Sequence, residues 1–121
     1  EKSETAKKDI LTDMGIKIFQ VPCSADGHVL MPRCFELMAE EGITTVLVEA
    51  GGHLTISLTQ SDLVDKLVIY RAPMIIGDDG IAAWHPLGVE QLCMAKTFAI
   101  KNIEQIGPDI IETYTRCTEA I

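Results

Sequence analysis

Two segments in the N-terminal half carry apolar residues at helical spacing, and a strand-like alternation lies between them. Residues 4–14 follow a helical pattern that stops at Gly15, and residues 16–21 alternate apolar and polar side chains. Residues 31–41 return to helical spacing, and Gly42 stands where a glycine commonly terminates a helix. The pattern therefore predicts a helix, a strand and a second helix.

The segment that follows is the most informative part of the chain. Residues 44–50 are mostly apolar and β-branched, with Glu49 as the only charged side chain, which predicts a strand buried on both faces. Gly51 and Gly52 allow a sharp turn and a close approach of backbone to a ligand, and a third helix is predicted from there to about residue 61. A helix start suits a phosphate, because its free N–H groups and partial positive charge point outward. A glycine pair that serves only a tight turn is the alternative.

The C-terminal half has strand-like segments separated by an irregular stretch. The pattern over residues 65–72 predicts a strand, whereas residues 74–88 follow neither helical nor strand periodicity. We expect this stretch to cover a sheet edge, the alternative being that it lines a site. Residues 96–105 and 109–117 alternate on either side of Ile106-Gly107-Pro108, which predicts an antiparallel hairpin.

The order of these elements predicts an α/β fold. βαβ units followed by a hairpin imply three layers, in which helices flank a mixed, mostly parallel sheet. The chain begins with a helix that would pack on a sheet, and no strand comes before it. Either the chain is a complete small α/β domain, or the preceding strands belong to sequence not present here.

Composition and charge argue against several classes of function. The 121 residues carry a formal net charge of -8 and no basic block, which excludes the usual nucleic-acid-binding surface. An apolar content of 47% indicates a folded core, and the apolar runs are too short to span a membrane. The four cysteines form no CxxC pair and the three histidines show no ligand spacing, so we expect no metal site. A cytoplasmic, soluble protein with reduced cysteines is the expectation.

Three motifs in order carry a family resemblance. Residues 47–54, 63–67 and 70–77 resemble the C-terminal reductase region of the bifunctional riboflavin-biosynthesis deaminase/reductase, and the likeness extends over about residues 5–118. The resemblance implies a dihydrofolate-reductase-like fold and an oxidoreductase that uses NADPH. It also implies the reaction, which is reduction of 5-amino-6-(5-phosphoribosylamino)uracil by hydride delivery to the sugar C1′. We expect a homodimer, since an open sheet that lacks its neighbouring strands is prone to pair with a second copy.

The same resemblance implies roles for individual residues. Glu49 matches the position that contacts the substrate, and no residue is assigned as catalytic. The segment that matches the NADPH phosphate site comprises Gly51, Gly52, His53, Leu54, Thr55, Ile56 and Ser57. Ile56 stands where the family often has a small residue, and Arg71 stands where an apolar residue is usual. We expect Arg71 to face solvent at an edge, the alternative being a charged contact with a partner.

Each site residue also has a purely structural interpretation. Glu49 could cap the following helix, and His53 could be an exposed first-turn residue that contributes only its backbone N–H. The hydroxyls of Thr55 and Ser57 could bond back along the helix. Trp84 and His85 could touch a ligand, although a tryptophan in an irregular loop more often packs.

The resemblance bears on domain organisation as well. The family's reductase domain begins with strands that this chain lacks, so residues 1–121 look like the C-terminal portion of a single reductase domain. The zinc-deaminase signature, a His-x-Glu with a later Pro-Cys-x-x-Cys, is missing, so we expect no deaminase domain in this chain. A non-catalytic nucleotide-binding module and an assembly module are the competing functions.

Overall fold

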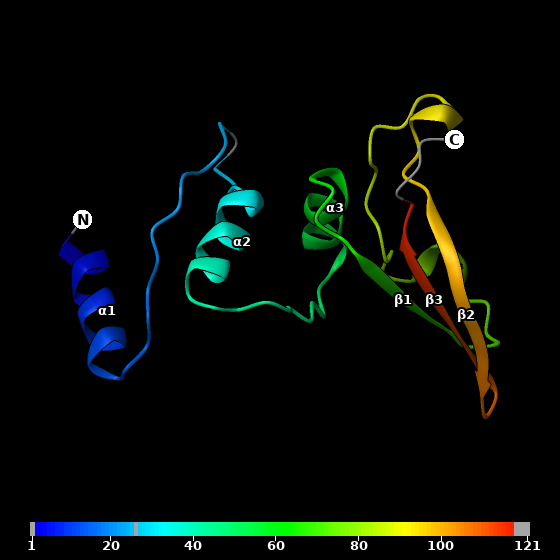
Figure 1. Ribbon diagram of the computed structural model, residues 1–121, viewed down its shortest axis with the longest axis horizontal. Helices are drawn as coiled ribbons and strands as arrows, with labels where there is room; N and C mark the ends of the chain where they lie inside the picture. Colours follow the sequence, from blue (N-terminus) through cyan, green and yellow to red (C-terminus); the bar gives the residue numbers. More distant parts are fainter. Residues whose placement is uncertain (1, 26, 118–121) are drawn as a thin grey trace. The chain divides into compact units, whose positions relative to one another are not determined.

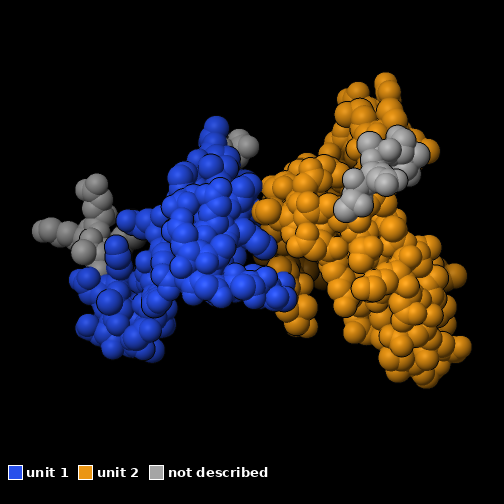
Figure 2. Space-filling view, in the orientation of Figure 1, with its two compact units in different colours: residues 1–46 blue, residues 47–121 orange. Residues whose placement is uncertain are grey.

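The computed structural model describes residues 2–25 and 27–117. The chain divides into two compact units, residues 1–46 and residues 47–121, which Figure 2 shows in different colours. Each unit is described by itself below.

Unit 1 contains two helices, α1 (Lys2–Asp13) and α2 (Met31–Glu40), as the sequence pattern predicts. Glycines end both helices: Gly15 and Gly42 have φ of 78° and 82°, a left-handed conformation that side chains with a Cβ rarely adopt. The N–H of Gly42 donates to the carbonyl of Ala39 at 2.9 Å, which satisfies one of the last carbonyls of α2.

The two strands expected around α2 are not formed. Residues 16–21 and 44–50 run as extended chain without a ladder of hydrogen bonds, and Leu47 is 83% exposed. The prediction of a strand buried on both faces over residues 44–50 is therefore wrong for this structure. The physical reason is that a strand needs a neighbour to pair its N–H and C=O groups, and no segment of the described chain lies in that position.

Unit 2 contains one helix, a three-stranded sheet and an irregular segment with two short 3₁₀ turns (Figure 1). Its elements are α3 (Gly52–Gln60), β1 (Lys66–Arg71), η1 (Gly77–Asp79), η2 (Leu92–Met94), β2 (Phe98–Ile106) and β3 (Asp109–Arg116).

The sheet has the order β1-β3-β2, and both pairings are antiparallel. The predicted hairpin is confirmed: Ile106 pairs with Asp109, and Gly107 takes φ of 60° in the turn between them. A bulge between Ile100 and Asn102 shifts the register of β2. The described chain thus combines helices with an antiparallel sheet, an α/β composition without the parallel strands expected from the sequence.

Few side chains are buried in the described residues. The apolar side chains of Leu58 on α3 and Ile111 on β3 are 5% and 7% exposed, and Thr59 on α3 is 7% exposed. Outward-facing apolar residues remain on the edge strand β2, where Ile100 is 63% exposed. The buried side chains of the described residues are therefore few, and they lie on α3 and on β3.

A polar cluster joins β1 to β3. Nη2 of Arg71 lies 3.1 Å from Oε1 of Glu112, and the Tyr114 hydroxyl donates to Oε2 of Glu112 at 2.9 Å. Arg71 is 64% exposed at its side chain, as expected for a solvent-facing position on an edge strand. The hydrogen bond to Glu112 raises the pKa of Tyr114, with burial as the second cause.

This cluster predicts that the folded chain loses stability at alkaline pH. Because the pKa of Tyr114 is higher in the folded chain, its contribution to stability is complete below the unfolded pKa of about 10 and is lost as pH rises through the folded pKa. We expect the difference in unfolding free energy between wild type and Tyr114→Phe to stay constant below about pH 10 and to shrink above it. Urea denaturation at a series of pH values measures this difference. A difference that grows with pH would contradict the assignment.

Candidate functional site

The residues singled out by the sequence lie where the extended segment 44–50 enters α3. Gly51 is the N-cap, with φ of -76° and ψ of 171°, and its carbonyl accepts the first helical hydrogen bond, from Thr55 N–H, at 3.2 Å. The N–H groups of Gly52, His53 and Leu54 belong to the first turn, where no helical carbonyl is available to them. Because a glycine N-cap has no side chain to bond these donors, they are available to an anion at the positive end of the helix dipole.

The two glycines of this turn have different surroundings. A Cβ built on Gly51 would meet no atom within 4 Å, whereas a Cβ on Gly52 would lie 2.8 Å from Cδ2 of His85 and 3.2 Å from the carbonyl oxygen of Ala82. Gly52 is accordingly buried, and Gly51 is exposed. Gly52 is thus required by packing within the protein, and Gly51 leaves open space in which a ligand can approach the backbone.

His85 is the residue near this turn that sequence reasoning did not place in the site. Its ring stacks on the ring of His53, with centroids 4.1 Å apart and planes inclined by 29°. His85 therefore packs against the first turn of α3. No spacing rule links His53 to a residue 32 positions later in an irregular segment, so the sequence carried no signal for this contact.

The hydroxyl groups along α3 bond back to the helix. Thr55 Oγ1 donates to the carbonyl of Gly51 at 3.2 Å, Ser57 Oγ to that of His53 at 3.1 Å, and Thr59 Oγ1 to that of Thr55 at 2.7 Å. These contacts match the structural interpretation of Thr55 and Ser57. In this arrangement the hydroxyl groups donate to helix carbonyls, and the backbone N–H groups of the first turn are the donors for which the helix offers no carbonyl.

Glu49 is exposed just before the turn. Within the described part of the chain, its carboxylate makes no hydrogen bond or ion pair with another residue, so it does not cap α3 here. A hydrated carboxylate can remain unpaired at little energetic cost, and it can accept hydrogen bonds from a polar ligand. The structure therefore places the carboxylate and the free N–H groups within a few residues of each other. Ile56, the departure from the family pattern, is half-buried on α3.

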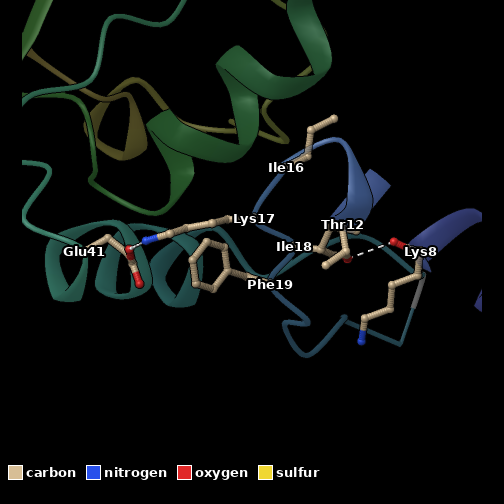
Figure 3. Close-up of a pocket in the computed structure, with 8 residues that line it drawn as sticks. Lys8, Thr12, Ile16, Lys17, Ile18, Phe19 and Glu41 are labelled. Atoms are coloured by element: carbon tan, nitrogen blue, oxygen red, sulfur yellow. Dashed lines mark hydrogen bonds and ion pairs between the residues drawn. The ribbon is translucent and has the colours of Figure 1, made fainter. Parts of the chain in front are cut away.

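A hollow in unit 1 contains none of these residues. It is lined by Lys8, Thr12, Gly15, Ile16, Lys17, Ile18, Phe19 and Glu41, and Figure 3 shows all of them but Gly15 as labelled sticks. Three polar side chains are already engaged there: Lys17 pairs with Glu41, and Thr12 Oγ1 donates to the carbonyl of Lys8 at 2.9 Å. Apart from the Lys8 side chain, the remaining lining is apolar, so the hollow lacks the several convergent polar groups of a ligand site.

Among residues 2–25 and 27–117, no three His, Cys, Asp or Glu side chains gather as a metal ion would require. In the same described residues, no helix has the length and apolar character needed to cross a membrane.

Comparison with known proteins gives consistent matches. The family model described as RibD C-terminal domain matches residues 1–112. The riboflavin biosynthesis protein RibD of Haemophilus influenzae is 42% identical over 83 residues, which cover 66% of this chain and 22% of that protein. The 5-amino-6-(5-phosphoribosylamino)uracil reductase of Buchnera aphidicola is 36% identical over 75 residues, covering 62% of this chain and 36% of that protein.

A solved structure shares the fold. Acinetobacter baumannii RibD (form 1) superposes with a TM-score of 0.75 at 23% sequence identity, over 91% of this chain and 29% of that chain. In all three comparisons with individual proteins, the chain spans well under half of the length of the protein that it matches.

Proposed function

The chain belongs to the RibD C-terminal domain family, and we propose that it is the C-terminal portion of a reductase domain in riboflavin biosynthesis. The proposed reaction is the NADPH-dependent reduction of 5-amino-6-(5-phosphoribosylamino)uracil to the ribitylamino product. The names of the related proteins support the pathway and the substrate class. The observation in this structure that carries the proposal is the open, uncapped start of α3 directly after a free carboxylate.

We propose that the complete domain has the three-layer, mostly parallel sheet predicted from the sequence, with neighbouring strands supplied by residues outside this chain. Two features support this. Residues 16–21 and 44–50 are extended next to helices and expose apolar side chains, as strands lacking their neighbours would. The chain also spans only 22% to 29% of the RibD proteins quoted above. Part of the substrate and cofactor site would then lie on those neighbouring strands.

The phosphate-binding turn, residues 51–54, is proposed to hold the phosphates of NADPH. The donor set fits this group, because three backbone N–H groups at a helix N-terminus suit an anion and Gly51 leaves room for it. Because the net charge of -8 repels an anion at long range, local dipoles have to supply the attraction for the phosphates. The segment through Ser57 completes the proposed cofactor contact, with Thr55, Ile56 and Ser57 shaping the helix behind the turn.

Glu49 is proposed to anchor the substrate. Its carboxylate accepts hydrogen bonds from N–H or O–H groups of the uracil compound and so orients the acceptor carbon. The nicotinamide cofactor, when bound, supplies the hydride. The residues of this chain therefore orient the substrate and the cofactor and provide the electrostatic environment of the reaction. None of them is assigned to transfer a proton.

Turnover by the whole natural protein tests this function. Oxidation of NADPH should depend on added 5-amino-6-(5-phosphoribosylamino)uracil, and mass spectrometry of the product should show the added hydrogen. Binding of NADPH with no reduction of this substrate would contradict the proposal and support the competing nucleotide-binding module.

A homodimer and a cytoplasmic location are proposed with the enzyme. The apolar side chains exposed on edge strand β2, such as Ile100, favour pairing with a second copy. Sedimentation analysis should show a dimer, and a stable monomer at high concentration would contradict it.

A further inference from the structure

One residue outside the proposed site holds the phosphate-binding turn from another part of the chain. His85 lies in the irregular segment between β1 and β2, and its ring is half-buried. It stacks on His53 with centroids 4.1 Å apart, and its Cδ2 stands where a Cβ on Gly52 would be only 2.8 Å away. His85 therefore packs against two consecutive residues of the turn.

Helical hydrogen bonds to the carbonyls of Gly51 and His53 hold one side of the turn, but no side-chain cap holds its first N–H groups. Its N-cap is a glycine, which offers no side-chain oxygen to the first-turn N–H groups and leaves the backbone more freedom than any other residue. The direction in which these N–H groups point depends on how the first turn of α3 is held. The flat ring of His85 can hold it closely because Gly52 has no Cβ.

We propose that His85 is a positioning residue for the phosphate-binding turn, acting through its contact with Gly52 and its stacking on His53. The inference rests on the proposed function, because it assigns the turn to the cofactor phosphates. His85 itself contacts no cofactor atom in this proposal; it keeps the N–H groups of the turn preorganised, which lowers the free-energy cost of binding.

Three variants of the whole natural protein test this role. His85→Ala removes the ring, His85→Phe keeps a flat ring of similar size, and Val89→Ala truncates an exposed side chain of the same irregular segment as a matched control. Hydrogen exchange at the Thr55 amide, which bonds to Gly51, reports on the turn without any cofactor. Fluorescence titration with NADPH and the KM for the uracil substrate report on binding.

We expect His85→Ala to speed exchange at Thr55 and to raise the dissociation constant of NADPH, each by about tenfold, with little change in the substrate KM. His85→Phe should restore most of both values, and Val89→Ala should resemble wild type. Wild-type exchange and affinity in His85→Ala would overturn the inference. So would a His85→Phe variant no better than alanine, or a substrate KM that rises as much as the NADPH dissociation constant.

Failure of the proposed function is distinguishable from failure of this inference. If exchange at Thr55 accelerates in His85→Ala and recovers in His85→Phe, while wild type binds no NADPH, then His85 positions the turn and the cofactor assignment is wrong. If wild type binds NADPH and none of the three variants changes exchange or affinity, the cofactor assignment stands and the role of His85 is wrong.

Discussion

Glu49→Gln is expected to lower kcat/KM for 5-amino-6-(5-phosphoribosylamino)uracil about 10- to 100-fold and to leave the dissociation constant of NADPH within about twofold. The magnitude follows from a hydrogen bond to a charged group, which contributes about 1.5–3 kcal/mol, and from about 1.4 kcal/mol per tenfold change in rate. Glutamine keeps the size of the side chain and removes its charge. Because Glu49 is exposed and unpaired within the described residues, its replacement should leave the fold intact.

Steady-state kinetics and NADPH titration on the same preparation measure both quantities. Glu104→Gln is the matched control, since Glu104 is an exposed glutamate on edge strand β2, away from the turn in sequence and fold. It should behave as wild type. Equal loss of substrate and cofactor binding in Glu49→Gln would contradict the role of substrate anchor.

Gly52→Ala is expected to destabilise the protein by about 1–3 kcal/mol, the usual range for forcing an extra methyl into a packed position. The new Cβ would lie 2.8 Å from the His85 ring and 3.2 Å from a backbone carbonyl. The higher helix propensity of alanine, worth at most about 1 kcal/mol, offsets only part of this. Gly51→Ala is the matched control: its Cβ meets nothing within 4 Å, and its unfolding free energy should stay within about 1 kcal/mol of wild type.

Urea denaturation compares the two variants, and equal destabilisation by both would contradict the geometry. A double variant separates the two neighbours of the Cβ. Gly52→Ala combined with His85→Ala removes the ring and keeps the Ala82 carbonyl, so the combined loss should be smaller than the sum of the single losses. A strictly additive loss would mean that the ring does not limit the space at Gly52.

Local patterns were enough to predict the helices and the hairpin. Helical spacing and a terminal glycine placed α1 and α2 to within about two residues, since these signals depend on the segment itself. The hairpin of β2 and β3 followed from two alternating runs around Gly107. The strand predicted over residues 65–72 formed as β1, because β3 lies beside it and pairs with it. The strands predicted over residues 16–21 and 44–50 did not form. The run over residues 44–50 favours extended chain, but a strand also requires a neighbour whose backbone can pair with it.

The candidate site likewise contains some residues that the sequence could place and others that it could not. The sequence could place Glu49, Gly51 and Gly52 at the entry to a helix, because strand-like residues, glycines and a helical pattern follow one another directly. It could not place His85 against Gly52, since irregular segments have no periodicity that fixes which side chain turns inward. It also left both interpretations of Thr55 and Ser57 open, and the hydrogen bonds to helix carbonyls were visible only in three dimensions.

We propose that the start of α3 holds the phosphates of the nicotinamide cofactor, and titration of NADPH into the isotopically labelled whole protein, followed by amide NMR, tests this at the turn itself. The amide signals of Gly52, His53 and Leu54 should shift the most among residues of this chain and saturate together. Saturable binding of NADPH that leaves these three amide signals unmoved would contradict it.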